Sequence, residues 1–227
     1  YARDLATIAA QPDVFWIGEY FERERLDEVQ DQILAGNFDA TQSGPLGPGY
    51  LSWLDSYGFS TNPDDYPVVD ITDDGIGNGT INAGDYTLHE FGDLANPTRL
   101  QYVENCTGEP DSGGPDGHGH INTNIVGGYD TTTGFPYQDP NGFNRGLGVS
   151  PYGRIAGTRV FGASGFDLSA CGSTDTGLIQ AEQDSGAQIS TNSWGGHSSI
   201  YDASSQACDV GGRDADQVAG VGEGGVG

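Results

Sequence analysis

The chain has 227 residues, of which 33 are acidic and eight are basic, so its formal net charge is −25. All eight basic residues are arginines. A surface this acidic repels nucleic acids and anionic membranes, which excludes them as partners. No apolar run reaches the roughly 20 residues that a membrane-spanning helix needs. The length suits one sizeable domain, and the acidity is typical of cation binding or solubility at high salt.

Residues 1–49 are expected to form an N-terminal unit that differs from the rest. Aromatic and β-branched residues predict a strand over 13–20, and the Gly- and Pro-rich stretch 37–50 predicts a linker. An amphipathic helix is predicted over 22–36, with one apolar face formed by Leu26, Val29, Ile33 and Leu34. Two interpretations stay open: this unit is the remnant of a propeptide, or it is an αβ extension of the main domain.

From residue 50 to residue 227, strand-like and helix-like segments alternate. This alternation predicts βαβ units, and therefore an α/β fold with a mainly parallel sheet flanked by helices. The predicted strands cover 66–72, 154–162 and 187–196, and the predicted helices cover 120–129, 174–186 and 199–211.

Three cysteines, Cys106, Cys171 and Cys208, lack the spacing of metal ligands. One disulfide with one cysteine left over is compatible with secretion, and the pairing stays open. The chain begins at Tyr1 and contains no Met, so we expect a processed piece of a longer product.

The stretch "DSGGPDGHGH" (111–120) holds two protease-like signatures side by side. "DSGGP" resembles the nucleophile loop of chymotrypsin-like proteases, which are all-β proteins with a His and an Asp before the Ser. The sole histidine before Ser112 is His89. The surrounding sequence alternates strand-like and helix-like segments, which disagrees with an all-β fold. Asp, Ser, Gly and Pro are also turn formers, so a plain turn explains "DSGGP".

Four other segments agree with a single family in their order. "VVDITDDGIG" (68–77) resembles the aspartate strand of subtilisin-like serine proteases, and "GHGHINTNIVGG" (117–128) resembles their histidine segment. "GLGVSPYGRIAGTRVFGASG" (146–165) and "AQISTNSWGG" (187–196) resemble two further strand segments of that family. The chain therefore resembles the N-terminal part of a subtilisin-like catalytic domain, and the resemblance implies that fold for residues 50–227.

The resemblance implies two members of an Asp–His–Ser triad, Asp73 and His118. Asp73 would fix the tautomer of His118, which would act as general base towards a serine. Asp74 is expected to be a solvated turn residue. A cleft strand is implied that binds an extended peptide by β-addition and comprises Thr191, Asn192, Ser193, Trp194 and Gly195.

The sequence departs from the family pattern at the nucleophile. No Gly-Thr-Ser-Met/Ala motif occurs before Gly227, and Glu223 stands where the family has its oxyanion Asn. We expect a secreted serine endopeptidase whose Ser lies beyond Gly227, so this chain alone would be inactive. The expected partners are a peptide or protein substrate and the protein's own propeptide. The alternative is a catalytically dead subtilisin-like subunit that binds peptides or has a structural role in an extracellular assembly.

Members of this family commonly hold structural Ca²⁺, and "DPNGFN" (139–144) precedes the segment where many relatives have a calcium loop. Asp139, Asn141 and Asn144 offer the oxygen ligands that calcium prefers. A turn built from Asp, Pro, Asn and Gly is the alternative interpretation of the same residues.

Overall fold

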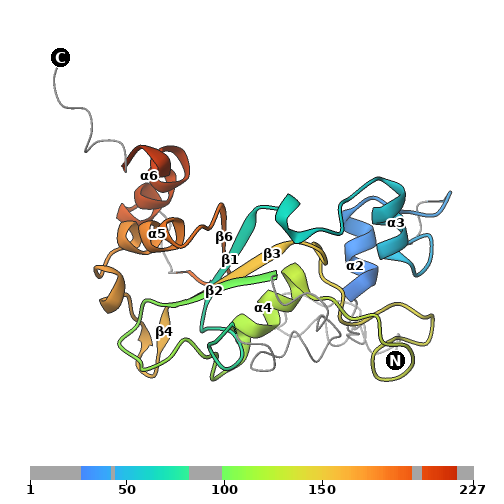
Figure 1. Ribbon diagram of the computed structural model, residues 1–227, viewed down its shortest axis with the longest axis horizontal. Helices are drawn as coiled ribbons and strands as arrows, with labels where there is room; N and C mark the ends of the chain where they lie inside the picture. Colours follow the sequence, from blue (N-terminus) through green and yellow to red (C-terminus); the bar gives the residue numbers. More distant parts are fainter. Residues whose placement is uncertain (1–26, 42–43, 82–98, 196–200, 219–227) are drawn as a thin grey trace, which may run out of the picture.

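A parallel sheet of four strands forms the centre of the protein, as a computed structural model that describes residues 27–41, 44–81, 99–195 and 201–218 shows (Figure 1). The strand order is β2-β3-β1-β6, and every neighbouring pair is parallel. This sheet and its flanking helices confirm the predicted α/β class. The strands are β1 (Val68–Asp73), β2 (Leu100–Asn105), β3 (Arg154–Arg159) and β6 (Ile189–Asn192).

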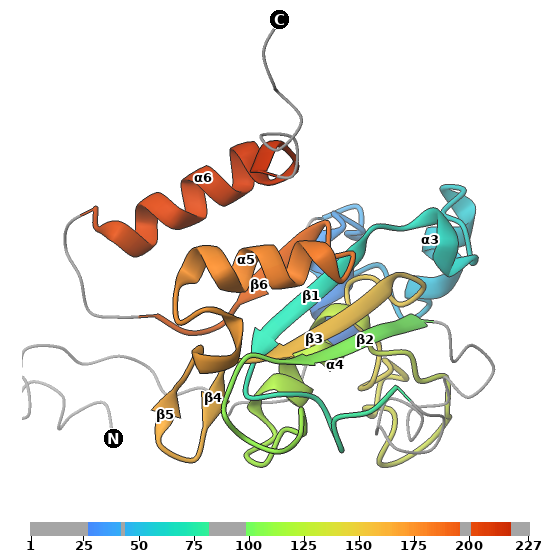
Figure 2. The same cartoon turned by 60° about the vertical axis from the view of Figure 1, so that its left-hand side comes forward.

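Helices cover both faces of this sheet. The helix α4 (His118–Gly127) packs on β1 and β3 from one side. On the other side lies α5 (Asp175–Asp184), and α6 (Ala203–Val218) packs on α5 (Figure 2). Among the described helices, none is both long enough and apolar enough to cross a membrane.

The two faces of β1 have opposite chemistry. Ile71 belongs to an apolar cluster with Ile155, and Val126 of α4 packs against this cluster. The neighbouring residue Thr72 is fully buried on the other face, where its hydroxyl donates a hydrogen bond of 2.6 Å to Glu182 of α5. The sheet is therefore joined to α4 by hydrophobic burial and to α5 by a buried polar network.

The N-terminal helix α2 (Asp27–Leu34) lies beside α3 (Tyr50–Ser56) at one end of the molecule (Figure 1). The predicted apolar face of this helix is wrong in part, because Ile33 is 44% exposed and Leu34 is 72% exposed. The fully buried side chains of α2 are polar, namely Glu28 and Gln32.

Glu28 explains this inversion. Its Oε1 accepts hydrogen bonds from the backbone N–H of Gly49 (2.6 Å) and of Tyr50 (2.7 Å). Its Oε2 accepts one from the backbone N–H of Asn144, also at 2.6 Å. One buried carboxylate thus joins α2 to the start of α3 and to the loop at Asn144, and supplies an acceptor to three backbone N–H groups.

Several predicted elements differ from the observed ones in extent. The helix predicted over 120–129 begins two residues earlier, at His118, and the strand predicted over 187–196 is confined to Ile189–Asn192. The strand predicted over 13–20 lies outside the described residues. The strand predicted over 154–162 is divided into β3 and the short β4 (Phe161–Gly162), which forms a hairpin with β5 (Gly165–Phe166). Elements without a sequence prediction are α3, β2, β5, and the short helices η2 (Pro63–Asp65) and η6 (Ser169–Cys171).

The stretch 37–50, predicted as a linker, is folded back on itself where the structure describes it. The backbone N–H of Asp39 donates to the carbonyl of Gly44, and that of Leu46 donates to Asn37. These bonds make the stretch a compact turn before α3. The boundary between residues 49 and 50 stays a prediction.

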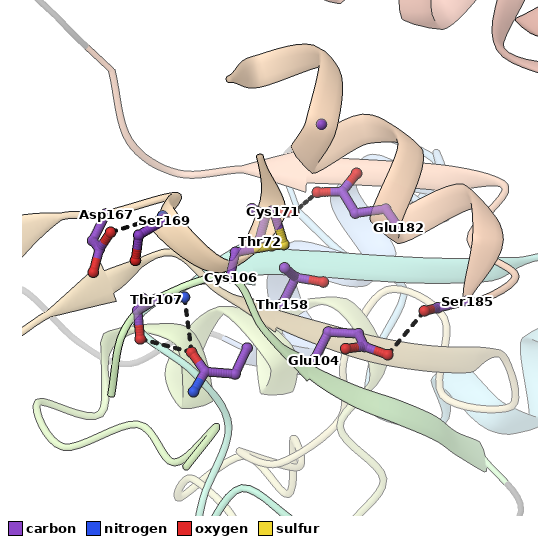
Figure 3. The surroundings of a disulfide bond; sticks show 12 residues. Thr72, Glu104, Cys106, Thr107, Thr158, Asp167, Ser169, Cys171, Glu182 and Ser185 are labelled. Atoms are coloured by element: carbon purple, nitrogen blue, oxygen red, sulfur yellow. Dashed lines mark hydrogen bonds between the residues drawn. A yellow bond between two sulfur atoms is a disulfide. The ribbon is translucent and has the colours of Figure 1, made fainter. Parts of the chain in front are cut away.

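A disulfide joins Cys106, just after β2, to Cys171 at the end of η6 (Figure 3). Cys106 is fully buried in a cluster with Val160 and Leu178, so the bond crosses the interior beside α5. Cys208 is an exposed free cysteine. A disulfide of this kind is compatible with an oxidising compartment outside the cytosol.

Candidate functional site

Asp73 and His118 are brought into direct contact by the fold. Asp73 is the last residue of β1, and His118 is the first residue of α4. The His118 Nδ1 and the Asp73 Oδ1 are 2.7 Å apart. The Asp73 side chain is 3% exposed and that of His118 is 59% exposed, so a buried carboxylate holds an accessible imidazole.

The pair lies where parallel sheets usually hold their sites. The strands of the sheet are parallel, so Asp73 and Asn192 end neighbouring strands at the same edge. In open α/β sheets, ligands bind outside this carboxyl edge. His118 lies at the same edge, because it is the first residue of α4 and its ring contacts Asp73.

Asn122 is a third member of this group that the sequence analysis missed. It lies one helical turn after His118, and its Nδ2 donates to the Asp73 Oδ2 at 2.9 Å. The same Nδ2 lies 3.3 Å from the His118 Nδ1. The two carboxylate oxygens of Asp73 therefore have separate partners on one helix face, which fixes the carboxylate relative to the ring.

Asp74 is not the solvated turn residue that the sequence indicated; it is 5% exposed. Its Oδ1 accepts a hydrogen bond from the backbone N–H of Gly119 at 2.6 Å, and its Oδ2 accepts one from that of His118 at 3.3 Å. Those N–H groups open α4 and have no acceptor within the helix. Gly117, the residue at the cap position, has no side chain to cap them, so Asp74 performs this task from another element.

Close backbone packing explains two glycines of the site. A Cβ at Gly119 would lie 2.8 Å from the Asp74 Oδ1 and 2.9 Å from the Asp73 Cβ. Gly75 has a φ of 107°, and a Cβ there would collide with the backbone of Ser112 and Gly113. Only glycine permits this approach without displacement of the neighbouring chain.

The "DSGGP" stretch forms a turn against the loop that follows β1. The backbone N–H of Gly114 donates to the carbonyl of Gly77, and the Asp111 Oδ1 accepts from the backbone N–H of Gly113. The same Oδ1 lies 3.1 Å from the guanidinium of Arg159 at the end of β3. Among the described residues, no serine hydroxyl is hydrogen-bonded to His118.

The environment of His118 favours its protonated form. The hydrogen bond to Asp73 raises the pKa of His118, and the negative charges of Asp73 and Asp74 act in the same direction. Desolvation of the ring opposes them. An imidazolium at this position is thus stabilised by the two carboxylates at the end of β1.

The expected cleft strand lies next to this pair. Thr191 and Asn192 end β6 and pair with Ile71 and Thr72 of β1. Asn192, Ser193 and Gly195 are exposed. The sheet therefore presents the end of β6 and the Asp73–His118 pair at one edge.

Trp194 has a structural contact in addition to its place on this segment. Its indole Nε1 donates to the carbonyl of Thr72 at 2.8 Å. Its ring packs on Phe161 and Phe166 of the β4–β5 hairpin, with ring centroids 6.2 Å and 4.9 Å away. Trp194 thereby ties the segment after β6 to β1 and to the hairpin.

The residues of the expected calcium loop form a hydrogen-bonded turn. The Asp139 Oδ1 accepts from the backbone N–H groups of Asn141 (2.8 Å) and Phe143 (2.9 Å). The Asn144 Oδ1 accepts from the Gln138 amide at 3.1 Å. Calcium takes six to eight oxygen ligands, and within the described chain no cluster of three or more His, Cys, Asp or Glu residues is arranged to hold a metal. Calcium binding stays a prediction.

Sequence reasoning missed Asn122 and the capping role of Asp74 for different reasons. Asn122 is four residues after His118, a spacing that puts both side chains on one helix face, so this signal was available. The role of Asp74 depends on the position of α4 relative to β1, which no local pattern contains. Glu223 lies outside the described residues. No protein-family model matches the chain, and no curated protein matches it.

Proposed function

We propose that this chain supplies the Asp and the His of a subtilisin-like serine endopeptidase that is secreted. The observation that carries the proposal is the contact of 2.7 Å between the Asp73 Oδ1 and the His118 Nδ1 at the carboxyl edge of a parallel sheet. The order of Asp before His along the chain and the four family-like segments support the same identity. The serine would come from outside residues 1–227.

In this reaction Asp73 accepts a hydrogen bond from the Nδ1–H of His118, which leaves Nε2 as the proton acceptor. Nε2 takes the proton of the serine hydroxyl as the serine oxygen bonds to the carbonyl carbon of the peptide. The imidazolium then gives this proton to the leaving amine, and Asp73 stabilises it in the meantime. The raised pKa of His118 agrees with this role, since Asp73 is its main cause.

Substrate would lie along the segment that follows β6. An extended peptide can add to exposed backbone by strand pairing, and Ser193 and Gly195 are exposed there. The hydrogen bond between Trp194 and Thr72 would hold this segment at a fixed position relative to Asp73.

A fluorophosphonate probe on the full-length secreted protein tests the proposal. The serine oxygen bonds to phosphorus, fluoride leaves, and His118 accepts the proton. We expect labelling of one serine, identified by peptide mass, and a loss of about 10⁴-fold in the labelling rate for His118→Ala. Absence of labelling at every calcium concentration would reject the protease and favour the non-catalytic subunit. Unchanged labelling in a folded His118→Ala protein would show that the serine works without this histidine.

A further inference from the structure

A cavity of about 290 Å³ lies at the end of the molecule where α2 and α3 meet. Its walls also include Tyr66, just before β1, and Tyr152, just before β3. Asp73 is seven residues after Tyr66 along an extended strand, so the cavity lies roughly 20 Å from the Asp73–His118 pair. Ligand pockets range from about 300 to 1,000 Å³, so this one suits a small molecule.

Aromatic side chains make up five of the twelve residues that line the cavity. Two hydroxyl groups in the wall are turned to backbone carbonyls: Tyr50 donates to Val149 at 2.9 Å, and Tyr66 donates to Ser60 at 2.5 Å. Tyr50 and Trp53 are stacked, with an interplanar angle of 14°. The aromatic members of the wall are Tyr50, Trp53, Phe59, Tyr66 and Tyr152.

One carboxylate lies in this aromatic wall. Asp31 of α2 lines the cavity, is 4% exposed, and is the single charged residue among the described residues of the wall. Its negative charge acts on the neighbouring ring, because burial and then Asp31 raise the pKa of Tyr50 to about 12. The cavity thus combines a negative charge with aromatic rings, whose faces are themselves electronegative.

We propose that this cavity binds a small methylated ammonium ion, such as the trimethylammonium head of choline. Aromatic faces attract such cations, and a carboxylate adds to this attraction. A primary ammonium has three N–H donors that need acceptors, whereas most members of this wall are apolar or aromatic. A methylated ammonium has few or no N–H groups, so it can enter an apolar wall without losing hydrogen bonds. A neutral apolar ligand would lack any attraction to Asp31.

Binding of choline is compared with binding of 3,3-dimethylbutan-1-ol, which has the same shape but a carbon in place of the charged nitrogen. Both are titrated into the full chain and followed by calorimetry and by tryptophan fluorescence. We expect choline to bind about tenfold more tightly than the alcohol. Equal affinities, or no binding of choline, would overturn the proposal without any variant.

Two variants locate the site. Asp31→Asn should reduce the preference for choline over the alcohol severalfold, leaving the part that the aromatic rings supply, while Asp64→Asn, which removes an exposed acid of η2, should leave it unchanged. Trp53→Leu should weaken choline binding about tenfold. This variant is the test of the cavity if Asp31→Asn does not fold. A preference that is undiminished in both Asp31→Asn and Trp53→Leu would place the cation elsewhere and reject this cavity. The site is independent of the proposed peptidase activity.

Discussion

The Asp74 carboxylate accepts a hydrogen bond of 2.6 Å from the backbone N–H of Gly119, and this bond connects the end of β1 to the first turn of α4. Asp73 and His118 are the immediate neighbours of these two residues in the sequence. The bond therefore sets the distance between the carboxylate and the imidazole through the backbone, independently of the bond that the two side chains make with each other.

Asp74→Ala should destabilise the protein by about 1–2 kcal/mol, because it removes the acceptor of two N–H groups at a helix start. Asp74→Asn should cost less, since its amide oxygen can still accept from Gly119. Urea unfolding followed by circular dichroism measures both. Equal stability of the alanine variant and the parent would show that water replaces the cap.

Asp73→Asn should lower the pKa of His118, because the hydrogen bond and charge of Asp73 are the main causes of its raised value. NMR titration of the histidine ring protons reports this pKa. Asp116→Asn is the matched control: Asp116 is exposed and two residues before His118, and its removal should change the pKa far less. If the pKa of His118 fell equally in both variants, the loss of one nearby negative charge would explain the change, and the Asp73–His118 hydrogen bond would not.

Asn122→Ala should cost about 1–2 kcal/mol, since it removes a hydrogen bond to a buried carboxylate. If the protein is a peptidase, this variant should also lose rate while it keeps its affinity for substrate, because Asn122 positions Asp73. The control is Ile125→Ala on the exposed face of the same helix. Loss of stability without any change in the rate or in the His118 pKa would limit Asn122 to a structural role.

Glu182 should make the protein less stable as the pH rises towards neutrality. Burial and then the charge of Asp70 raise the pKa of Glu182 from 4.5 to about 7, while the unfolded chain keeps the ordinary value. Between these two values the folded state holds a proton that the unfolded state has lost, so stability falls with pH, by on the order of 3 kcal/mol. Asp70 acts in the same direction, because burial raises its pKa as well.

Glu182→Gln should remove much of this slope and keep an acceptor for the Thr72 hydroxyl. Chemical unfolding between pH 4 and pH 8 measures it, with Asp184→Asn as the control at an exposed position of the same helix. If the free energy of unfolding varied with pH in the same way in the parent and in Glu182→Gln, the pH dependence would not come from Glu182.

Glu28→Gln should destabilise the protein by about 2 kcal/mol, because one of the three backbone N–H groups that the carboxylate binds would face an amide donor. The loss should appear in one cooperative transition if α2 is integral to the main domain, and as a separate early transition if it is a detachable unit. Asp55→Asn, an exposed acid of α3, controls for the removed charge. A change below about 0.5 kcal/mol would contradict the joining role of Glu28.

The sequence predicted those parts of the fold whose signals are local. Apolar residues around Val68 and Ile155 predict two central strands, and the helix after His118 follows from the glycines that bound it. The side-chain pair Asp73–His118 was predictable from a resemblance that orders four segments. By contrast, β2 ("LQYVEN") alternates little, and its residues after Leu100 are only partly buried.

The inverted face of α2 shows why the rest could not be predicted. Hydrophobic periodicity assigns Ile33 and Leu34 to the interior, yet Glu28 and Gln32 lie there, because loops more than ten residues away present backbone groups to them. Such polar burial depends on tertiary partners and leaves no period in the sequence. The capping of α4 by Asp74 has the same origin.

The disulfide has a consequence for a chain that has been cut. Cys106 precedes, and Cys171 follows, the stretch from Gly108 to Asp116, which includes several exposed residues. A single cut in this stretch leaves Asp73 on one fragment and His118 on the other, and the sulfur bridge keeps the fragments together. Such a nicked protein would migrate as one species without reductant and as two with it, so only reduction would reveal the damage. The Asp73–His118 contact would outlast the break in the peptide backbone.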